Sequence, residues 1–381
     1  MPTGRTTNEI EPRTPISAET TPGDADSVFR ITEPGSYYLT GNVVGEAGKH
    51  GIEIASGGVT LDLRGFSLMG VANSLSGIAG DGPRSGVHLF NGVIDGWGGA
   101  GIAGSEFENA IVRDLSCSNN GGDGVRLERG PVVERVTATG NGFFGILVSG
   151  GGSVRGCVAR SNGIDGILVS RSSSIENCSS SMNARDGYRF VDGIAAVGCA
   201  AASNGRYGFD AGAGSQLKAC TAMGNADDGF FLGSSSSVIG CFSRENRGDG
   251  FRLGSQATAE SCHAASNDGS GFVVGPSAIV LNNIASFNGN KFQGTGAGFL
   301  IVNRDSRIEG NNSISNGIGF EATGERSIII RNVARNNALN WEIGANNIVG
   351  EIVLAPTSGP ILGNMGGAGV GTVDPWANIT Y

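Results

Sequence analysis

The chain has 381 residues, of which 67 are glycine, 11 are proline and 39% are hydrophobic, and its net charge is −9 from 26 basic and 35 acidic residues. So much glycine with so little proline favours many tight turns around a thin core over a disordered chain. The acidic balance, without a stripe of clustered basic residues, argues against nucleic acid and anionic membranes as ligands, and no apolar run approaches the about 18 residues of a membrane-spanning helix.

The chain opens with a polar stretch. Its first 20 residues lack the apolar centre of an export signal, so any such signal of the natural protein is expected to precede this numbering. Residues 1–28 are predicted to form an arm or cap. Short apolar stretches punctuated by glycine then follow up to residue 110 and are typical of irregular strands. These stretches are Gly35–Leu39, Gly51–Ile54, Val59–Gly65 and Gly86–Gly92.

One asparagine recurs every 21 residues through the middle of the chain, and the recurrence resumes after a single slip of seven residues. The positions are Asn120, Asn141, Asn162, Asn183, Asn204, Asn225, Asn246, Asn267 and Asn288, then Asn316 and Asn337. A fixed period of this size indicates a solenoid. An asparagine at the corner of such a stack can bond the residues above and below it, so we interpret this column as structural.

Each repeat is predicted to hold three short strands. Apolar residues alternate after each asparagine, as in Phe251 and Leu253, and another apolar column precedes it. A repeat of 21 residues has no room for the helical crossover of about a dozen residues that other parallel sheets need. The sequence therefore predicts an all-β fold, a right-handed parallel β-helix over residues 29–345 with rungs about 4.8 Å apart. Residues 346–381, which carry Pro375 and Trp376, are the expected C-terminal cap.

Six of the seven cysteines follow the same period. They are Cys157, Cys178, Cys199, Cys220, Cys241 and Cys262. No two have the spacing of a zinc knuckle, and Cβ atoms stacked about 4.8 Å apart lie beyond the roughly 3.8 Å of a disulfide. We interpret them as reduced, buried thiols that pack as small hydrophobic groups. Two residues before this column, opposite charges alternate and predict a surface salt-bridge ladder of Arg113, Glu134, Arg155 and Glu176.

Several phrases of the chain point to a known group. Gly-Ile-x-Ile and Val-Thr-Leu-Asp-Leu precede many units of Cys/Asn-x-Ala-x-x-Asn-Gly-x-x-Gly-Ile/Phe. Together they resemble, over nearly the whole chain, the right-handed parallel β-helix repeat proteins of the pectin-lyase-like superfamily. The resemblance implies the fold of pectate and alginate lyases, polygalacturonases, mannuronan epimerases, phage tailspikes and adhesins. It also implies a secreted or cell-surface location and a polysaccharide or cell-surface glycan as partner, but fold alone does not assign an activity.

The catalytic motifs of those relatives are incomplete in this chain. Of the polygalacturonase set, only scattered fragments such as Asp227–Asp228 and Arg307–Glu309 are present, and the epimerase Asp-Pro-His motif is replaced by Asp374–Trp376. No cofactor is expected, except calcium if the protein is a lyase; no metal ligands are assigned, since no two of the three histidines share a column.

A constellation of charged residues on one face remains as the candidate site. Aspartates stand three residues after the ladder asparagine, and arginines or a further aspartate stand at the outward strand position nearby. The candidate catalytic residues are Asp186, Arg189, Asp210, Asp228 and Arg252. Such groups suit the base and cation of a lyase or the paired carboxylates of a hydrolase. The alternative is turn chemistry, in which each aspartate caps nearby backbone amides.

Two classes of function stay open at this point. The protein either engages polysaccharide along its lateral face, as a binder, a polysaccharide lyase or a glycoside hydrolase, or it is a non-catalytic structural or adhesive rod of a cell surface, an appendage or a phage. Neither nucleic acid nor membrane insertion is expected, and homo-oligomers are compatible with either class.

Overall fold

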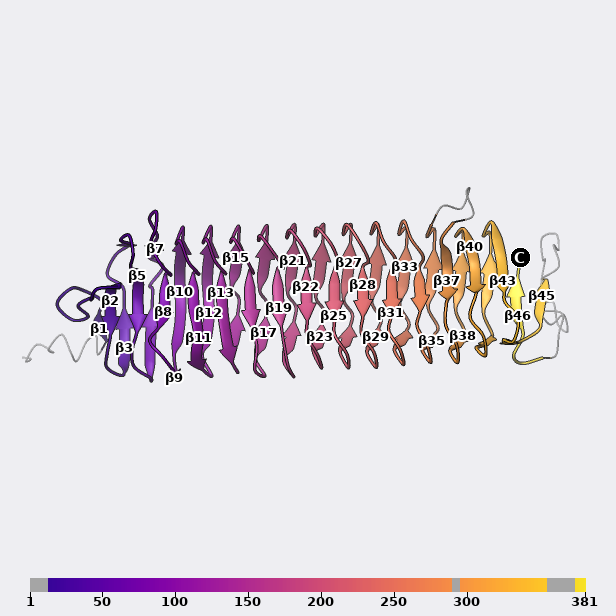
Figure 1. The fold of residues 1–381 in the computed structure, drawn as a ribbon, viewed down its shortest axis with the longest axis horizontal. Coiled ribbons are helices and arrows are strands. Elements are labelled where there is room, and N and C mark those ends of the chain that lie inside the picture. Colours follow the sequence, from indigo (N-terminus) through magenta and orange to yellow (C-terminus); the bar gives the residue numbers. More distant parts are fainter. Residues whose placement is uncertain (1–12, 290–294, 355–373) are drawn as a thin grey trace, which may run out of the picture. The chain divides into compact units, whose positions relative to one another are not determined.

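The computed structural model describes residues 13–289, 295–354 and 374–381 (Figure 1). These residues form parallel strands joined by turns, and among them no helix is long and apolar enough to span a membrane. The chain divides into two compact units, the first ending at Ile194 and the second beginning at Ala195. Each unit is a parallel β-helix, so the predicted fold class is confirmed. Parts of both expected caps, residues 1–12 and 355–373, lie outside the described residues.

In the first unit most rungs contribute two strands to one parallel sheet, sheet A, and one strand to a second, sheet B. The strands of sheet A are β1 (Thr14–Pro15), β3 (Gly35–Tyr38), β4 (Val43–Val44), β6 (Val59–Asp62), β7 (Ser67–Met69), β10 (His88–Asp95), β12 (Ile111–Ser118), β14 (Val132–Glu134), β15 (Thr137–Thr139), β17 (Ser153–Arg155), β18 (Val158–Arg160), β20 (Ser174–Glu176) and β21 (Ser179–Ser181). Those of sheet B are β2 (Ser27–Ile31), β5 (His50–Ile54), β8 (Ile78–Gly80), β9 (Arg84–Ser85), β11 (Ile102–Glu108), β13 (Val125–Arg129), β16 (Ile146–Val148), β19 (Ile167–Val169) and β22 (Tyr188–Phe190).

The second unit repeats this arrangement. Its sheet A strands are β23 (Ala195–Val197), β24 (Ala200–Ala202), β26 (Gln216–Lys218), β27 (Thr221–Met223), β29 (Ser237–Ile239), β30 (Phe242–Arg244), β32 (Thr258–Glu260), β33 (His263–Ala265), β35 (Ile279–Leu281), β36 (Ile284–Ser286), β38 (Arg307–Glu309), β39 (Asn312–Ile314), β41 (Ile328–Ile330), β42 (Val333–Arg335), β44 (Ile348–Val349), β45 (Ile352–Leu354) and β46 (Asn378–Thr380). Its sheet B strands are β25 (Phe209–Ala211), β28 (Phe230–Leu232), β31 (Phe251–Leu253), β34 (Phe272–Val274), β37 (Ala297–Ile301), β40 (Ile318–Ala322) and β43 (Leu339–Ile343).

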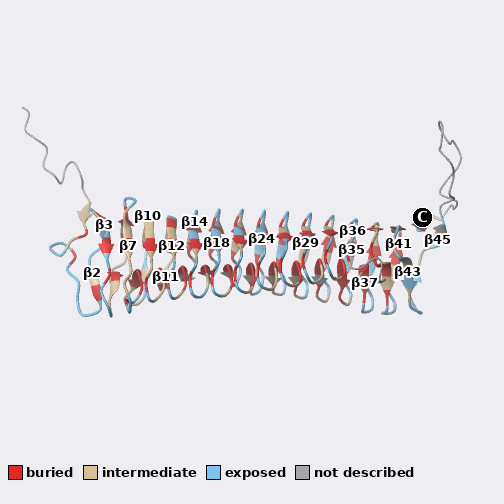
Figure 2. Cartoon of the chain, turned by 90° about the horizontal axis from the view of Figure 1, so that it is seen from above, coloured by how far each residue is buried: buried red, intermediate tan, exposed pale blue. Residues whose placement is uncertain are grey.

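The register between neighbouring regular strands is the 21-residue period itself. Phe230 pairs with Phe251 and Phe251 with Phe272, so equivalent side chains lie directly above one another. The slip of seven residues does not break this order, because Phe272 pairs with Phe299 and the side chain of Asn316 still accepts the amide of Asn288. Figure 2 shows buried residues along the strands and exposed residues mostly at the turns. The core is therefore a set of stacked side-chain columns inside each unit.

Aromatic rings form one of these columns in the second unit. The rings of Phe209, Phe230, Phe251, Phe272, Phe299 and Phe320 stack with centroids 4.7 to 4.9 Å apart. This spacing equals the separation of hydrogen-bonded strands, about 4.7–4.9 Å, so the backbone register imposes the stacking. All six rings are fully buried, which confirms that the phenylalanine column faces the core.

The asparagine column is a continuous hydrogen-bonded ladder within each unit. In the first unit Asn120, Asn141 and Asn162 each donate an amide N–H to the Oδ1 of the next asparagine at 2.9–3.0 Å. In the second unit the same bonds link Asn204 through Asn337 at 2.8–3.1 Å. Buried amides need such partners, because an unsatisfied one costs about 1–3 kcal/mol. The structural interpretation of this column is confirmed.

All seven cysteines are buried and free, and the six periodic ones occupy a second corner of the rung, whereas Cys117 lies within β12. The backbone N–H of Cys220 donates to the Sγ of Cys241 at 3.3 Å, and that of Cys241 to the Sγ of Cys262 at 3.4 Å. At the end of the run, the N–H of Cys262 donates to the Oδ1 of Asn283 at 2.8 Å, where asparagine takes over the column. The sulfurs therefore act as weak acceptors for corner amides, a role that adds to their packing.

Part of the predicted surface salt-bridge ladder is present on sheet A of the first unit. Arg155 lies between Glu134 and Glu176, with N–O distances of 3.8 and 3.2 Å. Arg113 instead pairs with Asp114 at 3.3 Å and lies over the ring of Phe90. The ladder is thus real over three rungs, and its first arginine has other partners.

Candidate functional site

The aspartates three residues after the ladder asparagine cap turns. The Oδ1 of Asp228 accepts the backbone N–H of Asp249 at 2.7 Å, and the Oδ1 of Asp249 accepts that of Ser270 at 2.7 Å. Asp165 bonds the amide of Asp186 in the same way at 3.1 Å. Each carboxylate thus replaces a backbone acceptor for the next rung, which is the turn chemistry that the Asn-x-x-Asp-Gly pattern allows.

In the first unit, the predicted residues Asp186 and Arg189 join an ion-pair group around Asp165. Arg185 lies 2.9 Å from Asp165 and 3.3 Å from Asp186, and Arg189 lies 3.9 Å from Asp165. Asp165 and Asp186 are fully buried. Burial raises the pKa of Asp165, and the amide of Asp186 and the two arginines oppose that rise. Both predicted residues therefore sit in one group, but their direct partners are Arg185 and Asp165.

In the second unit, two of the predicted residues are in direct contact. Arg252 Nε donates to Asp228 Oδ2 at 2.7 Å, and its Nη2 donates to Asp249 Oδ2 at 2.6 Å. Asp210 pairs with Arg206 at 2.9 Å. Asp210 and Arg252 come from the outward middle positions of β25 and β31.

Two aromatic side chains complete this group. Phe231 of β28 pairs in register with Asp210 on one side and with Arg252 on the other. The ring of Tyr207, in the turn before β25, stacks on that of Phe231 with centroids 5.1 Å apart and an angle of 10°. The guanidinium of Arg206 lies 4.2 Å from the centre of the Tyr207 ring. Both rings are half-buried, so they form a partly exposed aromatic platform.

We call this group the lateral cluster. It consists of Arg206, Tyr207, Asp210, Asp227, Asp228, Phe231, Asp249 and Arg252. The sequence interpretation missed Tyr207, although a signal was present, because Arg206 and Tyr207 replace the turn residues that precede Gly-Phe in neighbouring rungs. Phe231 occupies the outward middle position of β28, but its stacking on Tyr207 does not follow from the spacing of the repeat.

The lateral cluster carries more negative than positive groups. Its four aspartates face two arginines, which leaves two negative charges when all are ionised. Burial raises the pKa of Asp249, assisted by the charge of Asp228. Burial and Asp228 likewise raise the pKa of Asp227. For Tyr207, burial is again the first cause of a raised pKa, and the nearby carboxylates add to it. The site therefore favours protons and hydrogen-bond donors over further anions.

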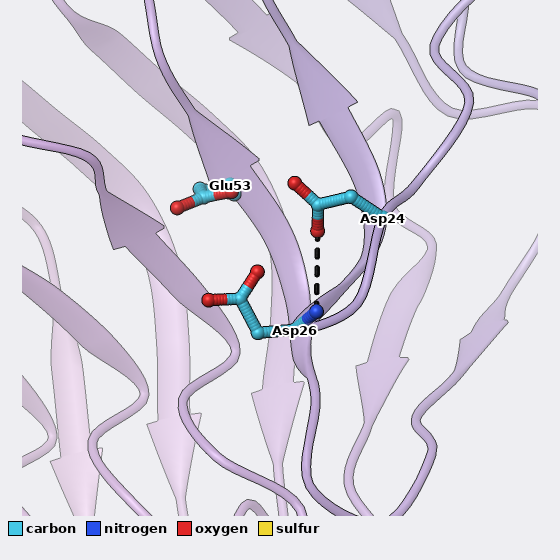
Figure 3. Close-up of side chains that lie close together, drawn as sticks. All are labelled: Asp24, Asp26 and Glu53. Atoms are coloured by element: carbon cyan, nitrogen blue, oxygen red, sulfur yellow. Dashed lines mark hydrogen bonds between the residues drawn. The ribbon is translucent and has the colours of Figure 1, made fainter.

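A second acidic group lies in the first unit. Asp24 and Asp26, from the turn before β2, and Glu53 of β5 have carboxylate oxygens within 4.8 Å of one another (Figure 3). Arg30 pairs with Asp24 at 2.9 Å and also with Glu53. Burial raises the pKa of Glu53, whereas the hydrogen bond from Ser27 lowers that of Asp24.

The acidic group does not fit calcium well. Calcium takes about six to eight oxygen ligands, whereas here a guanidinium already binds two of the three carboxylates. Arg30 thus holds Asp24 and Glu53 in an ion-pair group, and Asp26 lies beside it.

Comparison with solved structures finds similar folds at low identity. The A-module of a mannuronan C-5 epimerase from Azotobacter vinelandii is 15% identical over 83% of this chain and 91% of its own, with a TM-score of 0.46. The tailspike protein of E. coli bacteriophage HK620, in complex with a pentasaccharide, is 12% identical over 92% and 71%, with a TM-score of 0.41. At these values the likeness carries no argument about activity. A search of curated proteins gave no match.

The sequence itself matches a family model. The family described as right handed beta helix region matches residues 27–180 and 175–313, well over half of the chain. Because this match covers well over half of the chain and the structure has the parallel rungs of the fold, the chain belongs to the right-handed β-helix family.

Proposed function

We propose that this protein binds polysaccharide along its lateral face, through the lateral cluster of the second unit. The observation that carries the proposal is the stacked pair of Tyr207 and Phe231, half exposed and bordered by charged side chains. Buried aromatic columns are explained by the core of a β-helix. The stacked pair of Tyr207 and Phe231 lies outside that core.

The chemistry of the cluster suits a sugar chain. The C–H edges of a sugar ring carry a small positive charge and pack on the negative face of an aromatic ring. Hydroxyl groups donate to carboxylates such as Asp210 and accept from guanidinium groups such as Arg206. The outward positions of successive rungs are one strand spacing apart, so the sites for these contacts recur along the face.

The charge balance favours a neutral glycan. A chain of uronates would bring further carboxylates to a cluster in which four aspartates already outnumber two arginines, and like charges at close range repel. Neutral hydroxyl groups meet no such penalty, and the raised pKa of Asp227 and Asp249 is consistent with a site that resists added negative charge.

The geometry around Asp228 favours binding over catalysis. Both oxygens of Asp228 are used, one by the amide of Asp249 and one by Arg252. A general base must have an oxygen within hydrogen-bond reach of the proton that it removes, and both oxygens of Asp228 already bind other groups. Should the protein also cleave glycans as a lyase or hydrolase, Asp227 and Asp249, whose pKa values are raised, are the acids to test first.

The test is binding of the whole chain to neutral and acidic polysaccharides, measured by affinity electrophoresis and calorimetry. The Tyr207→Ala/Phe231→Ala double variant should lose affinity for the neutral polymer that the parent binds. Phe143→Ala is the matched control, since Phe143 is exposed in the other unit and its loss should change nothing. The same samples are assayed for new reducing ends and for unsaturated products.

The proposal fails if no polymer binds, or if the double variant binds like the parent. Absence of all binding would favour the alternative, a non-catalytic structural or adhesive rod. We further propose a secreted or cell-surface location, because a lateral glycan site is useful where polysaccharide is found; fractionation of the producing cells tests it. Homo-oligomer formation is tested by light scattering.

A further inference from the structure

A cavity of about 410 Å³ lies on the outer side of sheet A in the second unit, away from the lateral cluster. Its apolar wall is formed by Ile328 and Ile330 of β41, Ile348 of β44 and the indole of Trp376, and Arg307 and Asp374 are charged groups of its lining. The volume falls within the about 300–1,000 Å³ of small-ligand sites. Trp376 comes from the C-terminal segment, which breaks the 21-residue period, so this cavity is not a feature of the repeat.

Arg331 holds Trp376 in place. Its backbone N–H donates to the carbonyl of Trp376 at 3.2 Å, and its Nε donates to the carbonyl of Pro375 at 3.0 Å. The guanidinium lies 4.2 Å from the centre of the indole. A further bond at 3.0 Å joins Arg331 Nη1 to Glu309, so the arginine is itself anchored. The indole is thus fixed although 46% of the residue is exposed.

The main indication of a binding site is a fixed and exposed indole next to an apolar wall. Exposed tryptophan contributes little to folding, yet here one arginine makes a ring contact, two hydrogen bonds to the backbone of the segment, and an ion pair that positions it. Side chains that are immobilised before a ligand arrives lose little conformational entropy on binding. The arrangement therefore has the preorganisation of a binding site.

The polar lining offers both donors and acceptors without net charge. Arg307 uses Nε and Nη2 for Glu309, at 2.8 and 2.6 Å, and within the described part of the chain its Nη1 contacts no acceptor. Asp374 accepts the backbone N–H of Trp376 at 3.0 Å. The charges of Arg307 and Arg331 are balanced by those of Glu309 and Asp374.

We propose that this cavity binds a single neutral sugar ring, as a monosaccharide or as one residue of a glycan. A sugar ring has an apolar C–H face for the indole and the isoleucine wall, and hydroxyl groups for Arg307 Nη1 and Asp374. An anionic ligand would gain little from a site whose charges cancel, and a purely aliphatic ligand would leave the charged groups desolvated. The ligand class rests on the proposed function, but the residues are independent of the lateral cluster.

The experiment follows the Trp376 indole N–H by NMR while neutral monosaccharides and short neutral oligosaccharides are added at millimolar concentration. Trp97 is fully buried and serves as the internal reference. At least one sugar should shift the Trp376 signal in a saturable way. The Ile348→Glu variant should weaken that binding by about tenfold or more, and it should fold normally, since Ile348 is 63% exposed. The Trp376→Ala variant, whose binding is measured by calorimetry, should not bind the sugar.

Leu354→Ala is the matched control, because Leu354 is 74% exposed and does not line the cavity. The inference is overturned if no sugar shifts the Trp376 signal, or if the Ile348→Glu and Trp376→Ala variants bind like the parent. The two proposals fail separately. An unchanged polymer affinity in the Tyr207→Ala/Phe231→Ala variant refutes the lateral site, whereas a silent Trp376 signal refutes only the cavity.

Discussion

Removing one amide from the asparagine ladder is the sharpest test of how this fold is held together. In the second unit, Asn246 Oδ1 accepts both the backbone N–H and the side-chain N–H of Asn225, at 3.0 and 2.9 Å. Its own Nδ2 donates to Asn267 Oδ1 at 2.9 Å. Asn246→Ala leaves two buried donors of Asn225 without an acceptor. At about 1–3 kcal/mol for each, the free energy of unfolding should fall by about 2–6 kcal/mol.

The cysteine column provides a graded comparison. There a sulfur accepts a corner amide at 3.3–3.4 Å, so Asn246→Cys should restore a weak acceptor and cost less than Asn246→Ala. Gln216→Ala, at an exposed strand position, should stay within about 0.5 kcal/mol of the parent. Denaturant titration measures all three variants through their midpoints and slopes. A loss below about 1 kcal/mol for Asn246→Ala, or equal losses for alanine and cysteine, would refute the ladder reasoning.

Three further predictions concern the core, the pH dependence and the thiols. Phe251→Ala interrupts the stack between rings 4.7 and 4.8 Å away and should cost about 3–5 kcal/mol by denaturant titration; a loss near zero would mean that the column closes the gap. The pKa of Asp249 is raised above 3.8 in the folded protein, so the folded state binds the extra proton and stability falls as pH rises through that pKa. The Asp249→Asn variant should lose this part of the decrease in stability with rising pH. Curves of unfolding free energy against pH that run parallel for the two proteins would contradict the prediction. Burial raises the pKa of Cys117 to about 12, and all seven thiols are buried, so a thiol reagent should label them only in denaturant; fast labelling of the native protein would contradict the buried columns.

Most of the fold could be predicted because the same residue types recur at equivalent positions of each repeat. A residue that recurs every 21 positions must lie above its equivalents once the chain winds without helices, so Asn225 over Asn246 and Phe230 over Phe251 follow from counting alone. The same counting placed Asp228 and Arg252 on neighbouring rungs, and their ion pair confirms it. Positions that follow the period are readable from the sequence.

The contacts that the sequence did not predict involve residues that break the period. Tyr207 stands at a turn position where most other regular rungs carry aspartate, and its stacking on Phe231 depends on ring orientation, which spacing does not encode. The docking of Trp376 joins a non-repeating segment to Arg331, so no column relates the two.

This contrast indicates where function can reside in a β-helix. Each ladder residue is hydrogen-bonded to the equivalent residues above and below it, so changing one leaves buried polar groups next to it without a partner. Outward positions are not held by such bonds, so the residue types in their columns can differ from rung to rung. In the first unit the outward column of sheet B places Leu147 and Leu168 between Arg126 and Arg189, which separates the charged groups. In the second unit the same column places Asp210, Phe231 and Arg252 in consecutive rungs, so that an acid, a ring and a cation lie side by side.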